Sequence, residues 1–258
     1  LLAVVVLSNL VAIYTKAFAS SKRIIELFNL KENKQTGTLK EFKLNNYIFD
    51  ISNVNFSYFT TNNLRDISLK IKPGETIGII GLTGSGKSTF LKLLNNSLNI
   101  SSGNLKLYGE DIRKYDSSFL KSNITYIGQK PDFITATIFE NIALGRVTSK
   151  EEIQKSLELS NASEFVNQKE NTLNFVLQNN ASNLSGGQKQ RLAIARAIAR
   201  NPEIYIFDDS FSALDYKTDY TLREELRNYT KDSTNIIVAQ RIGTILNADK
   251  IIVLENGE

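Results

Sequence analysis

The stretch TIGIIGLTGSGKST, residues 76–89, decides the fold of this chain of 258 residues. Its first five residues are mostly apolar and predict a buried strand. Residues 81–88 then match the pattern G-x-x-x-x-G-K-[ST], and a helical pattern begins at Ser88. Glycines let backbone N–H groups turn toward an anion, and a helix N-terminus adds partial positive charge. A strand, a glycine-rich turn and a helix in this order predict a phosphate-binding loop in an α/β fold.

The residue types of this loop suit Mg-ATP. Lys87 can reach the β- and γ-phosphates as a mobile charge, and the hydroxyl of Ser88 can bind Mg²⁺. A flexible Gly-Ser loop is the alternative, but the buried strand in front of it and the Lys-Ser pair after the last glycine disfavour it. We therefore expect the phosphates to contact Gly81, Thr83, Gly84, Ser85, Gly86, Lys87, Ser88 and Thr89.

A second apolar run brings acids to the same place. Residues 204–207 predict a buried strand, and Asp208 and Asp209 follow it directly. Paired acids at a strand end could merely cap the next turn. Beside a phosphate loop, however, Asp208 is expected to bind Mg²⁺.

A second anion site is predicted at Leu184-Ser185-Gly186-Gly187-Gln188, which opens a helix over residues 188–200. Ser185 is a suitable N-cap, and the glycines leave the N–H groups of the first turn accessible. One ATP does not need two such helix ends from the same chain. The sequence therefore indicates a second ATP that is shared with a partner subunit.

Composition narrows the chemistry further. The chain has no Cys and no His, so any general acid or base must be a carboxylate or a group from elsewhere. The formal net charge is +4, but Lys and Arg are scattered rather than clustered, and we expect no nucleic-acid partner.

The N-terminal part differs from the rest. Residues 1–14 are apolar but fewer than the roughly 20 that cross a bilayer, which leaves either the inner end of a transmembrane helix or an amphipathic core helix. Lys22 and Arg23 follow within residues 19–30, as on the cytoplasmic side of a membrane. We expect a membrane helix and its extension at 1–30, a linker at 31–46, and a domain at 47–258 that opens with an antiparallel β layer.

These motifs together resemble the nucleotide-binding domain of ATP-binding cassette (ABC) transporters of the exporter type, including the exporter-like stretch at residues 137–142. The resemblance implies that Tyr58 stacks on adenine, that Gln129 contacts Mg²⁺ and senses the transmembrane domain, and that Asp215 contacts ATP from the D-loop. It also implies that Ser185, Gly186, Gly187 and Gln188 are the signature, which completes the ATP site of a second half-transporter.

The same resemblance implies a P-loop NTPase fold. Its core sheet is mostly parallel, an antiparallel layer lies at the N-terminal side, and a helical subdomain covers about residues 130–190. The implied cofactors are ATP and Mg²⁺. The implied location is the cell membrane, with this domain on the cytoplasmic side and joined to the chain's own transmembrane domain. The helix at residues 1–14 then becomes the end of the last membrane span.

Three departures from the family pattern concern catalysis. Asp209 replaces the catalytic glutamate, Gln240 replaces the switch histidine, and residues 178–181 replace Gly-Glu-x-Gly. Asp209 retracts the carboxylate by about 1.5 Å, and such misplacement can cost on the order of 100-fold in rate. Glutamine donates hydrogen bonds but carries no charge.

These departures predict a degenerate site in a heterodimer, with Asp209, Gln240 and Gln129 as the candidate catalytic residues. Binding of ATP should survive better than its hydrolysis. A slow but active homodimer is the alternative, followed by a soluble ABC ATPase without a transport function.

Overall fold

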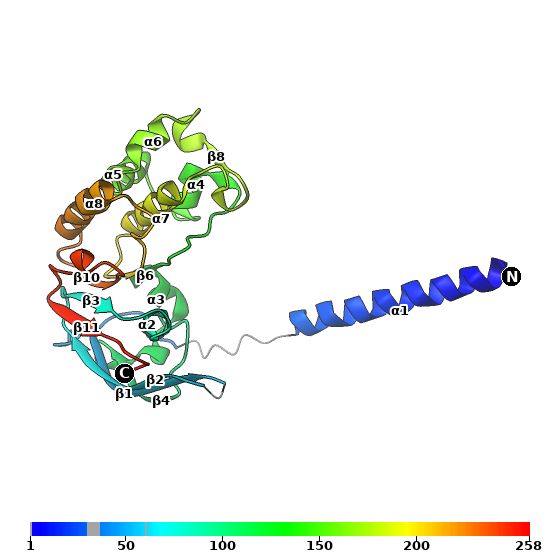
Figure 1. Cartoon of the computed structure of the whole chain (residues 1–258), viewed down its shortest axis with the longest axis horizontal. Coiled ribbons are helices and arrows are strands. Elements are labelled where there is room, and N and C mark those ends of the chain that lie inside the picture. Colours follow the sequence, from blue (N-terminus) through cyan, green and yellow to red (C-terminus); the bar gives the residue numbers. More distant parts are fainter. Residues whose placement is uncertain (1, 30–36, 60) are drawn as a thin grey trace. The chain divides into compact units, whose positions relative to one another are not determined.

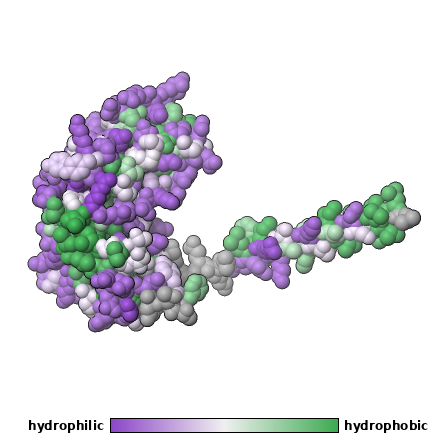
Figure 2. Space-filling view, in the orientation of Figure 1, coloured by the Kyte–Doolittle hydropathy of each residue, from purple (hydrophilic) through white to green (hydrophobic). Residues whose placement is uncertain are grey.

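The computed structural model describes residues 2–29, 37–59 and 61–258, and the chain forms two compact units, Leu1–Gln35 and Thr36–Glu258 (Figure 1). The described part of the first unit contains the helix α1 (Leu2–Phe28), in which no described residue is buried. It joins the two helical patterns of the sequence into one helix of 27 residues. At 1.5 Å per residue such a helix is about 40 Å long, which exceeds the roughly 30 Å of a bilayer core. Apolar side chains lie exposed along it (Figure 2), and α1 is long and apolar enough to cross a membrane.

The second unit begins with the predicted antiparallel layer. Four strands pair in the order β2-β1-β4-β5, namely β1 (Phe49–Tyr58), β2 (Thr61–Ile71), β4 (Ser102–Leu107) and β5 (Glu110–Asp111). Phe49 lies between Ile71 of β2 and Leu107 of β4, and all three side chains are buried. The antiparallel layer is therefore confirmed.

The core sheet is parallel throughout its five strands, in the order β11-β3-β10-β9-β6. These strands are β3 (Thr76–Ile80), β6 (Ile124–Ile127), β9 (Ile204–Asp208), β10 (Thr234–Val238) and β11 (Lys250–Val253). Because all five run in one direction, the residues that follow them meet at one edge of the sheet. The phosphate loop, the segments that contain Gln129 and Asp209, and Gln240 all start at that edge.

The core sheet separates two hydrophobic cores. In β9, Ile204 and Ile206 pack into the core that contains the antiparallel layer and α2 (Lys87–Leu94), whereas Tyr205 and Phe207 pack into the core of the helices. This division follows from the alternation of side chains along a strand. Both faces of the sheet are therefore packed against a hydrophobic core.

The helices after β6 gather at the opposite end of the unit from the antiparallel layer (Figure 1). They are α4 (Ile138–Ala143), α5 (Lys150–Leu159), α6 (Ser163–Asn167), α7 (Gly186–Arg200) and α8 (Tyr216–Tyr229), with the short strands β7 (Ala136–Thr137) and β8 (Val176–Leu177) among them. The remaining elements are α3 (Ser117–Asn123), η1 (Ile112–Lys114), η2 (Thr172–Asn174), η3 (Asn179–Ala181) and η4 (Ile242–Thr244).

The folded domain begins earlier than the expected boundary at residue 47. Residues 31–36 of the expected linker lie outside the described residues, but Leu39 forms two backbone hydrogen bonds, with Lys114 and Asp116. The ring of Phe42 packs against an aromatic cluster of Tyr108, Tyr115 and Phe119. Two apolar residues are therefore enough to attach a polar segment to the domain.

Candidate nucleotide-binding site

The phosphate loop requires glycine at two positions because other atoms approach its backbone closely. Gly81 has φ +154°, and a Cβ there would lie 2.1 Å from the carbonyl oxygen of Leu254. Gly86 has φ +101°, and its Cβ would lie 2.8 Å from a methyl carbon of Leu64. The loop is thus fixed from both sides by β2 and by the residue after β11.

Lys87 places its charge inside this loop. Its Nζ donates to the carbonyl oxygens of Gly81 and Leu82, at 2.7 and 2.6 Å, and lies 3.4 Å from the hydroxyl of Ser85. The residue is also the first of α2, whose N-cap, Gly86, provides no side-chain acceptor for the N–H groups of the first turn. An ammonium group and accessible N–H donors at one helix end form a site for a phosphate chain.

Oxygen ligands for a cation lie directly beside the loop. The hydroxyl of Ser88 donates to Oδ1 of Asp208 at 3.1 Å, and Asp208 is buried at the end of β9. Among the described residues no group of three His, Cys, Asp or Glu side chains could hold a metal ion. Mg²⁺ commonly takes only one or two protein oxygens and completes its shell with phosphate and water, so Ser88 and Asp208 fit this ion. When bound, Mg²⁺ would neutralise negative charge on the phosphate oxygens.

The three candidate catalytic residues meet at one carboxylate oxygen. Gln129 follows β6, Asp209 follows β9 and Gln240 follows β10. Oδ2 of Asp209 accepts from Nε2 of Gln129 at 3.0 Å and from Nε2 of Gln240 at 2.7 Å. Burial raises the pKa of the Asp209 carboxyl, the charge of Asp208 adds to the rise, and the two amide donors oppose it. The arrangement is an acid held between two neutral amides.

The residues of the predicted second anion site cap their own helix. Ser185 is the N-cap of α7. Its hydroxyl oxygen accepts from the backbone N–H of Gln188 at 3.3 Å, and its own backbone N–H donates to the side-chain oxygen of Gln188 at 3.0 Å. Within the described part of the chain, no hydrogen bond joins residues 185–188 to the phosphate loop. Asp215 likewise caps α8, because its Oδ1 accepts from the N–H of Thr218 at 3.0 Å. The structure therefore does not bring these residues to the phosphate loop of the same chain.

With this geometry in place, comparison with known proteins assigns the family. A sequence model described as "ABC transporter" matches residues 64–212, which is more than half of the chain. The chain belongs to the ABC transporter family. The match begins in β2 and ends just after Asp209, so it includes the phosphate loop, Gln129 and residues 185–188.

Several relatives in the ABC transporter family are similar over nearly the whole chain. The chain is 36% identical over 256 residues to an "ATP-dependent lipid A-core flippase" of Pasteurella multocida (strain Pm70), covering 98% of this chain and 44% of that protein. A protein of the same description from Francisella tularensis subsp. holarctica (strain OSU18) is 33% identical over 253 residues, covering 97% and 41%.

A solved structure, a bacterial Atm1-family ABC exporter with ATP bound, superposes with a TM-score of 0.84 and 27% identity, over 94% of this chain and 43% of that one. The chain thus spans less than half the length of the relatives it matches.

Two further positions concern the family motifs. Tyr58, the expected adenine-stacking residue, lies at the end of β1 and is 38% exposed. The centre of its ring lies 4.7 Å from that of Phe56, in edge-on contact.

Asn180, within the segment that replaces Gly-Glu-x-Gly, accepts from the N–H of Phe133 at 2.8 Å. Its Nδ2 also donates to Oδ1 of Asp132 at 3.4 Å, so two hydrogen bonds that the sequence did not reveal join this segment to the residues that follow Gln129.

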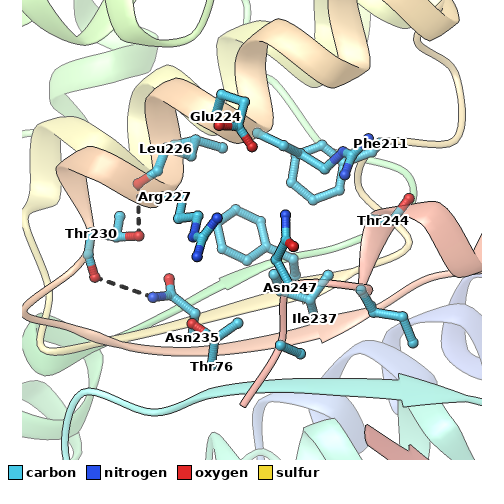
Figure 3. Close-up of a pocket in the computed structure, with 14 residues that line it drawn as sticks. Thr76, Phe211, Glu224, Leu226, Arg227, Thr230, Asn235, Ile237, Thr244 and Asn247 are labelled. Carbon is cyan, nitrogen blue, oxygen red and sulfur yellow. Dashed lines mark hydrogen bonds between the residues drawn. The ribbon is translucent and has the colours of Figure 1, made fainter. Parts of the chain in front are cut away.

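A pocket outside the nucleotide-binding residues lies between α8 and β10 (Figure 3). Its lining includes Asn235, whose amide donates to the carbonyl oxygen of Thr230 at 3.2 Å. Arg223 also lines it, pairs with the buried Asp219 at 3.0 Å, and donates to the carbonyl oxygen of Gly243 at 2.9 Å. Since Gly243 lies three residues after Gln240, this arginine fastens the segment after Gln240 to α8.

Proposed function

We propose that the chain is the ATP-binding subunit of an ABC exporter whose own site holds Mg-ATP and hydrolyses it poorly. The observation that carries the proposal is the environment of Asp209. Its Oδ2 accepts from both Gln129 and Gln240, at 3.0 and 2.7 Å. The two amides occupy the oxygen with which Asp209 would otherwise accept a proton from water, and neither amide can take up or release a proton.

Binding of ATP rests on groups that are all in place. Lys87 and the first turn of α2 offer positive charge to the phosphates, and Ser88 and Asp208 offer oxygens to Mg²⁺. These interactions stabilise bound ATP itself, whereas a base and a switch residue act mainly on the transition state. The site therefore retains what binding needs and lacks what rapid cleavage needs.

The partner of this chain is proposed to be a second, different half-transporter. The N-terminus of α7, residues 185–188, is capped but makes no hydrogen bond to the phosphate loop in the described residues. It is free to complete the site of an opposing cassette. The closure and release of the two cassettes around ATP would then rock the transmembrane halves between inward and outward states.

The proposed location is supported by α1. This helix is long and apolar enough to cross a membrane, and Lys22 and Arg23 lie near its C-terminal end. We place α1 at the end of the last membrane span, in the cell membrane, with the nucleotide-binding domain on the cytoplasmic side.

The first test compares the full-length chain alone and together with its partner half-transporter in membranes. ATP turnover of the pair is expected to lie far above that of the chain alone. Equal rates per cassette would contradict the degenerate site and support the slow homodimer.

The second test restores the family residues in the complex with the pair Asp209→Glu and Gln240→His. Vanadate trapping of radiolabelled azido-ATP on this chain is expected to rise, because trapping requires hydrolysis at the labelled site. The matched control is Asp232→Glu with Gln168→His, since both of these residues are exposed. If the restored pair traps no more label than the control, Asp209 and Gln240 do not limit hydrolysis.

A further inference from the structure

Tyr126 reaches the same carboxylate as Ser88, and the register of the core sheet explains why. In the parallel pair of β6 and β9, Tyr126 lies opposite Ile206. Asp208 follows two residues later on β9 and therefore points to the same face as Ile206. Two residues of a strand rise about 6.6 Å, so only a long side chain at position 126 can reach the carboxylate.

The two oxygens of Asp208 each accept one hydrogen bond. The phenol of Tyr126 donates to Oδ2 at 2.6 Å, and the hydroxyl of Ser88 donates to Oδ1 at 3.1 Å. Asp208 is only 6% exposed, so water has little access to either oxygen. The carboxylate is thus held in one orientation, with Oδ1 facing the phosphate loop.

The phenol is a dependable donor. The ordinary pKa of a tyrosine phenol is about 10. The phenol therefore keeps its proton across the physiological range. A donor on Oδ2 also leaves Oδ1 as the oxygen that is available toward a cation beside Ser88.

We propose that Tyr126 is a positioning residue for the Mg²⁺ of the bound nucleotide, and that it acts by fixing Asp208 through Oδ2. Groups that orient a metal ligand without touching the metal typically change metal affinity or activity by 10- to 100-fold when removed. The contribution of Mg²⁺ to ATP affinity should therefore depend on the Tyr126 hydroxyl. This inference rests on the proposed binding of Mg-ATP but not on hydrolysis.

The test is Tyr126→Phe in the full-length complex. Radiolabelled azido-ATP is photocrosslinked to this chain, which is separated from its partner by electrophoresis. The apparent Kd is measured with excess Mg²⁺ and with EDTA. The ratio of these two Kd values reports the gain from Mg²⁺, and the variant should reduce that gain by about tenfold or more while leaving the Kd in EDTA unchanged.

Tyr115→Phe is the matched control. Its phenol is buried and donates to the backbone oxygen of Leu107 at 2.9 Å, away from Asp208. Both substitutions remove one satisfied phenol and can lower thermal stability, but only Tyr126→Phe should change the ratio.

Equal ratios in the wild type and in both variants would overturn the role of Tyr126. Loss of affinity for Tyr126→Phe in EDTA as well would also overturn it, because the effect would then not concern the metal. If the wild type itself gains nothing from Mg²⁺, the proposed function fails at the level of Mg-ATP binding. The two failures are therefore distinguishable.

Discussion

Gln240 donates its side-chain N–H to Oδ2 of Asp209 at 2.7 Å, so an amide holds the acid that follows β9. Gln129 donates to the same oxygen at 3.0 Å. Among these three side chains only Asp209 carries charge. This relationship leads to a test of the acid itself.

The substitution Asp209→Asn should stabilise the nucleotide-free protein at neutral pH. Burial raises the pKa of Asp209 above its ordinary 3.8, so the folded state binds this proton more tightly than the unfolded state. Stability from this group is present below about pH 3.8 and is lost as pH rises through the raised pKa. The variant avoids that loss, because Asn is neutral and its oxygen can still accept from Gln129 and Gln240.

The measurement is the Tm of both proteins from pH 3.5 to 8 without nucleotide. The difference between variant and wild type should be positive at pH 7 and should shrink toward acid pH. A difference that stays constant across this range, or that grows as the pH falls, would contradict the assigned direction.

Lys87→Met tests the charge in the phosphate loop. The methionine keeps much of the side-chain length but loses the ammonium group, which donates to Gly81 and Leu82. Hydrogen bonds to charged groups contribute about 1.5–3 kcal/mol, so ATP should bind on the order of 10- to 100-fold more weakly. The control is Lys92→Met, an exposed residue in the last turn of the same helix. Photolabelling with azido-ATP measures both, and equal affinities would remove Lys87 from the site.

Much of this site could be predicted from the sequence because its signals are local. The phosphate loop is a contiguous motif. The strand before it and the strand before Asp208 are both continuous apolar runs, which is typical of buried parallel strands. The approach of Gln129 and Gln240 to one oxygen of Asp209 could not be derived in this way, since it depends on the spacing of three strand ends.

Tyr126 was missed for a related reason. A single tyrosine in a strand is common, and only the register with β9 shows that it lies two residues short of Asp208 on the same face. The start of the domain was placed too late because Leu39 and Phe42 stand isolated in a polar segment. Their partners, such as Tyr108 and Tyr115, lie far along the chain.

Gly81→Ala should damage the domain as a whole. The added Cβ would meet the carbonyl oxygen of Leu254 at 2.1 Å and the hydroxyl of Ser85 at 2.7 Å, at a φ of +154° that other residues rarely adopt. Strained backbone and overpacking each cost about 1–3 kcal/mol, so the loss of stability should be about 2–6 kcal/mol. Gly243→Ala is the control, since a Cβ there meets nothing within 4 Å. Denaturant titration measures the unfolding midpoint of both variants. Equal midpoints would contradict the prediction, because they would show that the loop accommodates the added Cβ without loss of stability.

Ser185→Ala separates a structural role from a role in a shared site. Ser185 caps α7 and Ser149 caps α5, each in a capping box with the third residue of its helix, Gln188 and Glu152 respectively. Removing either cap should cost about 1 kcal/mol of stability. If residues 185–188 complete the hydrolytic site of the partner, Ser185→Ala should also lower the ATP turnover of the complex, and by much more than Ser149→Ala does. The rates are compared at a temperature where both variants are fully folded. Because both changes remove the same kind of cap from the same domain, equal turnover would assign Ser185 to helix capping alone.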